Sequence, residues 1–249
     1  MKILVALKQV LDTETKIKIA PDGKSVDLAD VKWITNPYDE YALEEALRIK
    51  ESSCGEVTVI SVGDDKARTM LQSALALGAD NAVLLKSSNV DDPIIVARTL
   101  AAFAKDKDFN LIILGNRSFG GDNACVGPAL AELLNMAQAN VITKLEIIDG
   151  VFKAEREVDS GIEIIDGKLP VVVTAQRGLN EPRYASLKGI IAAKKKAIEI
   201  IEVEPMEPLT TIVALSLPPD RPSGINIEGD ADTQVTTLLE LLHNETNLI

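Results

Sequence analysis

The sequence is short of the residues that build disulfide frameworks, metal centres and histidine-dependent active sites. It has two cysteines and one histidine in 249 residues. Cys54 and Cys125 are far apart and form no C-x-x-C motif, which argues against a disulfide framework or a zinc site. His243 lies in a segment of helical periodicity, so we expect it to have a surface or packing role. We therefore expect no catalytic residues, no bound metal and a reducing, cytoplasmic location.

Long apolar runs, aromatic residues and a surplus of positive charge are also missing. No stretch approaches the roughly 20 apolar residues of a transmembrane helix, and the apolar start of the chain turns charged too soon for a signal peptide. Aromatic residues make up 3%, so the core has to be aliphatic. The formal net charge of -12 argues against nucleic acid as a partner, because phosphate binding needs a Lys and Arg surplus.

What the chain does have is enough apolar sequence for one dominant domain. We place this domain at residues 1–201 and a C-terminal arm at residues 202–249. The arm opens with a Glu- and Pro-rich linker, and its patterns predict a strand at 211–217 and a helix at 232–243. Because the arm is too small to form its own core, we expect it to pack on its own domain or on a partner.

Within the domain, short β-branched runs alternate with longer stretches of helical period. The predicted strands are 2–10, 57–62, 82–85, 111–114 and 170–175, and the predicted helices are 39–52, 66–77, 92–105 and 126–134. This alternation predicts an α/β fold with a mostly parallel twisted sheet and helices on both faces. The Asp149-Gly150 turn between 144–148 and 151–154 predicts a β-hairpin. Acidic or amide residues before three helices predict N-caps at Asp64-Asp65, Asp91-Asp92 and Asp122-Asn123.

Ligands of open parallel sheets bind outside the carboxyl ends of the strands. Three segments are expected at that edge, namely 6–8, 62–64 and 115–127. The third is the most informative, because its glycines and the helix start after it allow backbone N–H groups to approach a phosphate. The alternative is a plain flexible connection. Neither G-x-G-x-x-G nor the P-loop motif is present, so a nucleotide would have to be held in another way.

Two residues near this edge each allow two interpretations. Asn36, in the sequence Asn-Pro-Tyr-Asp, could cap the following helix or present its side chain to a purine. Cys125, at a helix start, could have a lowered thiol pKa, although a small packing residue is the favoured interpretation.

The segment Leu-Asn-Glu-Pro-Arg-Tyr-Ala-Ser-Leu at 179–187 resembles the beta-subunit family of electron transfer flavoproteins. The resemblance continues into Ile-Ile-Ala-Ala-Lys-Lys-Lys at 190–196. Further motifs of the family occur in order, namely Lys-Gln-Val at 8–10, Asn-Pro-Tyr-Asp at 36–39, Ala-Leu-Gly-Ala-Asp at 76–80, Gly-Asp-x-Ala-x-Val-Gly-Pro at 121–128 and Arg-x-x-Asp-x-Gly-x-Glu at 156–163. The similarity thus covers nearly the whole chain.

The resemblance implies an adenine-nucleotide alpha-hydrolase-like domain that pairs with a larger alpha subunit carrying the electron-transferring FAD. It implies electron transfer between acyl-CoA or other flavin dehydrogenases and a downstream acceptor. The sheet edge of this chain would hold AMP, as in simple carriers, or a second FAD, as in bifurcating members that oxidise NADH. The residues that match this nucleotide site are Ala6, Asn36, Pro37, Tyr38, Asp39, Val62, Arg117, Ser118, Phe119, Gly120, Gly121, Asp122, Asn123, Ala124, Cys125 and Val126.

The resemblance also implies a surface for docking of a partner. Leu187 matches an exposed leucine that inserts into an apolar pocket of the dehydrogenase, and Arg183 and Tyr184 lie in the same segment. Glu157 matches an acidic residue near the interface with the flavin domain. Without the resemblance, Leu187 would be expected in the core and Glu157 would be an ordinary exposed strand carboxylate.

The chain departs from the family pattern at three places. Phe119-Gly120-Gly121 replaces Ile-Asp-Gly or Ile-Asp-Asp, Cys125 replaces Gln, and Thr13 stands where simple carriers often have a Tyr near the partner's flavin. Val126-Gly127-Pro128 is closer to the bifurcating group, so AMP and FAD both stay open, with AMP favoured.

Two other functions fit parts of the sequence. An ATP-pyrophosphatase-type enzyme has a loop faintly similar to Ser118–Asp122, but after its first strand. The chain could also be a regulatory nucleotide-binding module of the universal-stress type, but that interpretation does not explain the motif at residues 179–196.

Overall fold

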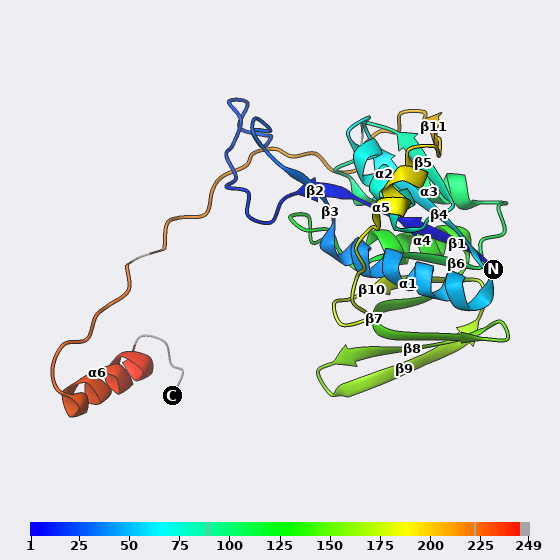
Figure 1. Cartoon of the computed structure of the whole chain (residues 1–249). Coiled ribbons are helices and arrows are strands. Elements are labelled where there is room, and N and C mark those ends of the chain that lie inside the picture. Colours follow the sequence, from blue (N-terminus) through cyan, green and yellow to red (C-terminus); the bar gives the residue numbers. More distant parts are fainter. Residues whose placement is uncertain (89, 222, 245–249) are drawn as a thin grey trace.

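A nine-stranded sheet forms the centre of the molecule (Figure 1). The structure is a computed structural model that describes residues 1–88, 90–221 and 223–244. The strand order is β11-β5-β4-β1-β6-β10-β7-β8-β9. The strands are β1 (Lys2–Ala6), β4 (Glu56–Gly63), β5 (Asn81–Lys86), β6 (Leu111–Gly115), β7 (Ala137–Ile148), β8 (Val151–Val158), β9 (Gly161–Lys168), β10 (Val171–Ala175) and β11 (Ile198–Glu202).

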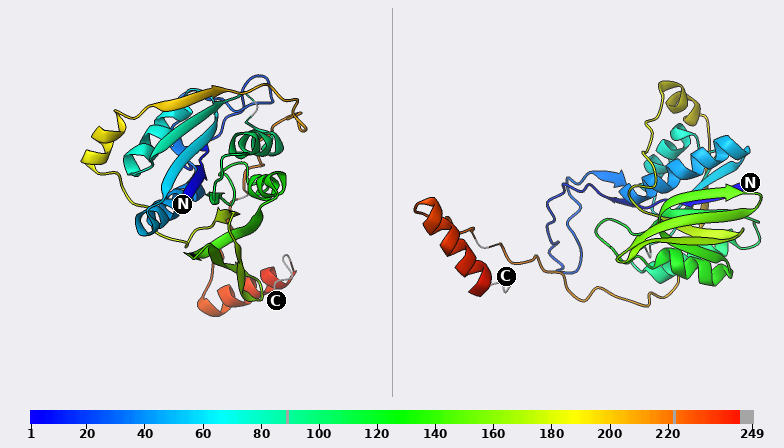
Figure 2. Two further views of the ribbon diagram at one scale, coloured as in Figure 1. Left: turned by 90° about the vertical axis from the view of Figure 1, so that its right-hand side faces the viewer. Right: turned by 90° about the horizontal axis from the view of Figure 1, so that it is seen from below.

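Helices cover both faces of the sheet (Figure 2). On one face, α1 (Pro37–Ser53) and α2 (Ala67–Leu77) pack their aliphatic side chains against β1, β4 and β5, and α5 (Leu187–Ala193) packs against α2. On the other face lie α3 (Pro93–Ala104) and α4 (Val126–Leu134). Strands buried on both faces must be apolar throughout, which is why β6 and β10 read LIILG and VVVTA. The predicted α/β fold is confirmed.

The order in which the chain adds parallel strands to the sheet reverses beside β1. This strand pairs with β4 on one side and with β6 on the other, both in parallel. The chain first builds β4 and β5 outward and then returns across the sheet to β6. At such a switch point, the connections after the two central strands leave toward opposite faces and open a crevice between them.

The predicted hairpin is confirmed and is longer than expected. Asp149 and Gly150 have φ values of 51° and 79°, as a two-residue turn between twisted strands requires. β7, β8 and β9 continue the sheet in antiparallel order. The sequence did not predict β9 or β11, because most residues of these strands are exposed and leave no buried apolar pattern.

The single strand predicted at 2–10 is wrong. β1 ends at Ala6, and β2 (Gln9–Leu11) then pairs antiparallel with β3 (Trp33–Thr35), which was also not predicted. The break occurs because the Lys8 N–H donates to the Asp39 carboxylate, at 2.6 Å, and so leaves the ladder of the main sheet.

Of the predicted helix caps, only Asp92 is confirmed. Its Oδ1 accepts hydrogen bonds from the N–H groups of Ile94 and Ile95. Helices α2 and α4 have Lys66 and Cys125 at the N-cap and no side-chain cap, so the predicted caps at Asp64-Asp65 and Asp122-Asn123 are wrong. The start of α4 therefore keeps uncapped N–H groups at the sheet edge.

The C-terminal arm leaves the body after β11 and runs away from it (Figure 1). Oδ2 of Asp92 accepts hydrogen bonds from the N–H groups of Leu209 and Thr210 and so holds the root of the arm. The strand predicted at 211–217 is wrong, because the described chain offers this segment no strand to pair with. The predicted last helix is confirmed as α6 (Ala231–Asn244), and none of its described residues is buried.

Candidate functional site

A cavity of about 90 Å³ lies at the sheet edge, where β1, β4 and β6 end. The first residues of α3 and α4 complete its rim. Its wall is apolar and is formed by Ile60, Val62, Val96, Leu100 and Leu114. The cavity therefore lies at the switch point of the sheet, where the topology predicts a ligand.

The cavity loop, residues 115–126, is held by the start of α1. Asn36 donates from Nδ2 to the Arg117 carbonyl at 2.9 Å, and its Oδ1 accepts from the Phe119 N–H at 3.0 Å. Asn36 is buried and is the N-cap residue of α1, but its side chain makes no capping hydrogen bond to the helix. Its carboxamide positions a loop that is about 80 residues away in sequence, as its two bond partners show.

Asp39 joins the ends of two strands beneath the cavity. Oδ2 accepts from Lys8 N–H and Oδ1 accepts from Gly115 N–H, the latter at 2.9 Å. Gly115 has to be glycine, because a Cβ there would overlap Asp39 and Tyr38. Burial raises the pKa of Asp39 to about 7, although hydrogen bonds from Lys8, Asn36 and Gly115 act in the opposite direction. This buried carboxyl group thus fixes β1 relative to β6.

The cavity offers both hydrogen-bond donors and an acceptor that have no partner in the chain. The backbone N–H groups of Asn123, Ala124 and Cys125, just before α4, have no acceptor within the described residues. Asn116 Oδ1, also at the cavity, is buried and unpaired within the same residues. The Asn116 oxygen is buried, so leaving it unpaired is costly, and a hydrogen-bond donor of a ligand would satisfy it. The N–H groups before α4 suit an anionic group. An adenine nucleotide has both.

The structure brings together ten of the sixteen residues predicted for the nucleotide site. Those lining the cavity are Ala6, Asn36, Asp39, Val62, Arg117, Ser118, Asn123, Ala124, Cys125 and Val126. Those outside its lining are Pro37, Tyr38, Phe119, Gly120, Gly121 and Asp122. Two of the residues outside the lining, Tyr38 and Asp122, contact Arg117, which does line the cavity. Arg117 donates to Tyr38 Oη at 2.8 Å and lies 3.5 Å from the Asp122 carboxylate.

Several cavity residues were not among the sixteen named for the nucleotide site. Gly115, the last residue of β6, and Asn116 lie in the segment 115–127 that was predicted at the sheet edge, but they were not named individually. Val90, Asp91 and Pro93 line the cavity from the α3 side, where the sequence indicated only a helix cap. Val96 and Leu100 gave no signal, because an apolar helix residue facing a cavity has the same pattern as one facing the core.

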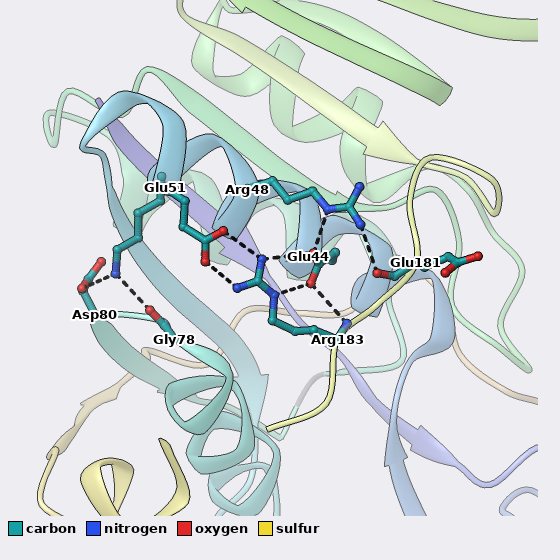
Figure 3. A network of polar contacts seen from close by, with 8 residues as sticks. Glu44, Arg48, Glu51, Gly78, Asp80, Glu181 and Arg183 are labelled. Carbon is teal, nitrogen blue, oxygen red and sulfur yellow. Dashed lines mark hydrogen bonds and ion pairs between the residues drawn. The ribbon is translucent and has the colours of Figure 1, made fainter. Parts of the chain in front are cut away.

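The residues predicted for docking are at the surface but have different surroundings. The side chains of Tyr184 and Leu187 are 98% and 75% exposed, so the core position that Leu187 would otherwise have is excluded. Arg183 instead binds Glu44 and Glu51 of α1 (Figure 3). Glu157 is exposed on β8, opposite Ile162 of β9.

The described residues show neither a cluster of metal ligands nor a membrane-spanning helix. No group of His, Cys, Asp or Glu within residues 1–88, 90–221 and 223–244 could hold a metal ion. In the same ranges, no helix has the length and apolar character needed to span a bilayer.

The fold and the cavity define a doubly wound α/β protein with a cavity at the carboxyl edge of its sheet. Comparison with known proteins is more specific. Residues 25–206 match the model of the electron transfer flavoprotein domain. The chain is 41% identical to the electron transfer flavoprotein subunit beta of Bacillus subtilis over the full length of both. It is 44% identical to that of Bradyrhizobium diazoefficiens over 80% of each chain, and 36% identical to the mitochondrial subunit of Arabidopsis thaliana over the full length.

This chain belongs to the electron transfer flavoprotein beta-subunit family. The resemblance found in the sequence is therefore confirmed. Membership implies a role in electron transfer rather than classical enzyme catalysis, together with an alpha-subunit partner.

Proposed function

We propose that this chain forms a heterodimer with an alpha subunit that carries the redox-active FAD, and that the cavity at its own sheet edge holds AMP. The observation that carries the proposal is the pairing in one cavity of the unpaired Asn116 oxygen with open N–H groups at the start of α4. The N–H groups of residues 123–125 would receive the phosphate, and Asn116 would accept from the adenine amine. The apolar wall would cover the base.

One feature of the sequence supports AMP over a second FAD. The cavity loop has Phe119-Gly120-Gly121 in place of Ile-Asp-Gly or Ile-Asp-Asp and so lacks a carboxylate. The alternative is a bifurcating protein that oxidises NADH and holds a second FAD, which the sequence Val126-Gly127-Pro128 favours.

In this proposal the chain supplies binding and docking, while the flavin of the alpha subunit supplies the redox chemistry. Leu187 and Tyr184 would bind an acyl-CoA dehydrogenase or another flavin dehydrogenase. Glu157 would lie near the mobile flavin domain of the alpha subunit. The arm would extend over the alpha subunit, because Val235, Leu238 and Leu239 form an exposed apolar stripe along α6.

The test is the nucleotide content of the purified heterodimer. Acid extraction followed by chromatography should give one FAD and one AMP per heterodimer. Two FAD and no AMP would replace the proposal with the bifurcating alternative, and a heterodimer without flavin would refute both. Asn116→Ala should retain FAD and lose AMP, whereas Asn110→Ala, at the opposite edge of the sheet, should retain both.

A further inference from the structure

The docking segment, residues 179–187, lies along the outer side of α1 (Figure 3). Two of its apolar side chains, Tyr184 and Leu187, are largely exposed between two fixed points of the chain. An exposed loop with apolar anchors is ordinarily mobile, and a partner would then have to order it at a cost in affinity. The contacts on either side of the anchors reduce that cost.

Arg183 is the main fixed point on the N-terminal side of the anchors. Its Nε donates to Glu44 Oε2 at 2.8 Å, and its Nη2 donates to Glu44 Oε1 and to Glu51 Oε2, both at 3.1 Å. Its Nη1 also donates to Glu51. Every nitrogen of the guanidinium is therefore bound to a carboxylate of this chain, in the paired geometry that makes arginine–carboxylate bonds strong.

The electrostatics of this cluster agree with its geometry. Burial pushes the pKa of Glu44 upward, but hydrogen bonds from Arg183 and Arg48 outweigh it and hold that pKa below its ordinary value. The hydrogen bond from Arg183 also lowers the pKa of Glu51. Glu44 and Glu51 thus face the guanidinium groups of Arg48 and Arg183, so the charge of Arg183 is balanced on the α1 side.

Further bonds hold the segment on the N-terminal side of Arg183. Asn180 donates from Nδ2 to the Tyr41 carbonyl at 3.0 Å and to Glu45 Oε2 at 2.9 Å. Arg48 donates to the Glu181 carbonyl at 3.3 Å.

On the C-terminal side, Ser186 caps α5 by accepting from Gly189 N–H at 3.0 Å. A Cβ on Gly189 would overlap the Ala76 carbonyl oxygen, so α5 packs closely on α2. The anchors Tyr184 and Leu187 lie between these contacts.

We propose that Arg183 is a positioning residue: it holds Tyr184 and Leu187 in their docking geometry through Glu44 and Glu51 and does not itself contact the dehydrogenase. The sequence placed Arg183 with the docking contacts, and the structure assigns it to the support behind them. This inference rests on the proposed docking function of Leu187.

A double-mutant cycle on the complete heterodimer tests the inference. The assay follows electron transfer from an acyl-CoA dehydrogenase with its acyl-CoA substrate as the concentration of flavoprotein is varied. The variants are Arg183→Gln, Glu51→Gln, both together, and Leu187→Ala. Arg98→Gln is the matched control, because Arg98 is an exposed arginine on α3, which covers the other face of the sheet.

Arg183→Gln should raise KM for the flavoprotein about tenfold and leave kcat unchanged, since ordering of the loop is required only for docking. Glu51→Gln should raise KM about threefold, and the double variant should be no worse than Arg183→Gln alone. Arg98→Gln should leave KM unchanged. In the heterodimer without dehydrogenase, amide exchange at residues 180–186 should be faster in Arg183→Gln, while the bound nucleotide stays constant.

The opposite results would overturn the inference. If Arg183 binds the dehydrogenase directly, Glu51→Gln frees it, so KM stays the same or falls and amide exchange in Arg183→Gln is unchanged. If Leu187→Ala raises KM but the Arg183 and Glu51 effects do not couple, only the positioning role is wrong. If Leu187→Ala leaves KM unchanged, the docking function itself is wrong and the inference fails with it.

Discussion

Helix α1 holds both the cavity loop and the docking segment, but through different parts of its length. Asn36 and Asp39, at its start, bind backbone groups of the cavity loop and of the ends of β1 and β6. Glu44, Glu45 and Glu51, further along the same helix, bind the docking segment. The cavity loop places the unpaired Asn116 oxygen at the cavity, whereas the docking segment exposes the apolar side chains of Tyr184 and Leu187.

The two sets of bonds also differ in kind. At the cavity, buried side chains bind main-chain atoms, which fixes the backbone path and suits a small ligand that needs close positioning of N–H groups. At the docking segment, most bonds join side chains, and Glu51 is largely exposed. Exposed ion pairs are weaker, so the second loop is the one that substitution or salt should loosen first.

Asp39→Ala should have the largest effect in either region. It leaves the buried N–H of Gly115 and the N–H of Lys8 without their acceptor, which should lower the free energy of unfolding by about 3 kcal/mol. Urea unfolding measures the loss, and nucleotide content should fall with it. Asp39→Asn is the milder control, because it keeps one acceptor oxygen. Unchanged stability in Asp39→Ala would show that Asp39 does not join the strands.

How much of this arrangement can be predicted from the sequence depends on how far apart in the sequence the contacting residues lie. The strands and helices of the domain follow from local periodicity, and the Asp149-Gly150 turn follows from its own residues. The contacts of Asn36 and Arg183 join positions more than 80 and 130 residues apart, and no local pattern specifies such partners. Exposed edge strands such as β9 cannot be predicted for another reason, because a strand without a buried face has no alternating apolar pattern.

The pH dependence of stability should also come from the cavity side. Burial raises the pKa of Asp39 in the folded chain to about 7 from its ordinary value of 3.8. Between these values the folded state holds a proton that the unfolded state has lost, so this group stabilises the fold most at low pH. The contribution is lost as pH rises through 7, by about 2 kcal/mol between about pH 5 and pH 7.

Urea unfolding of the wild type and of Asp39→Asn at both pH values isolates this contribution. The difference between the two proteins should shrink as pH rises. A difference that is independent of pH would mean that Asp39 is ionised in the folded chain throughout the range.

Glu45→Ala should have the smallest effect and should separate the two regions. Glu45 accepts from Asn180, which keeps its second bond to the Tyr41 carbonyl, so the loss should be about 1 kcal/mol. Amide exchange at residues 180–186 should become faster and nucleotide content should stay the same. Glu40→Ala is the matched control, because Glu40 is an exposed acid of the same helix. Loss of nucleotide in Glu45→Ala without faster exchange in the docking segment would show that α1 transmits changes between its two loops, and that they are not held independently.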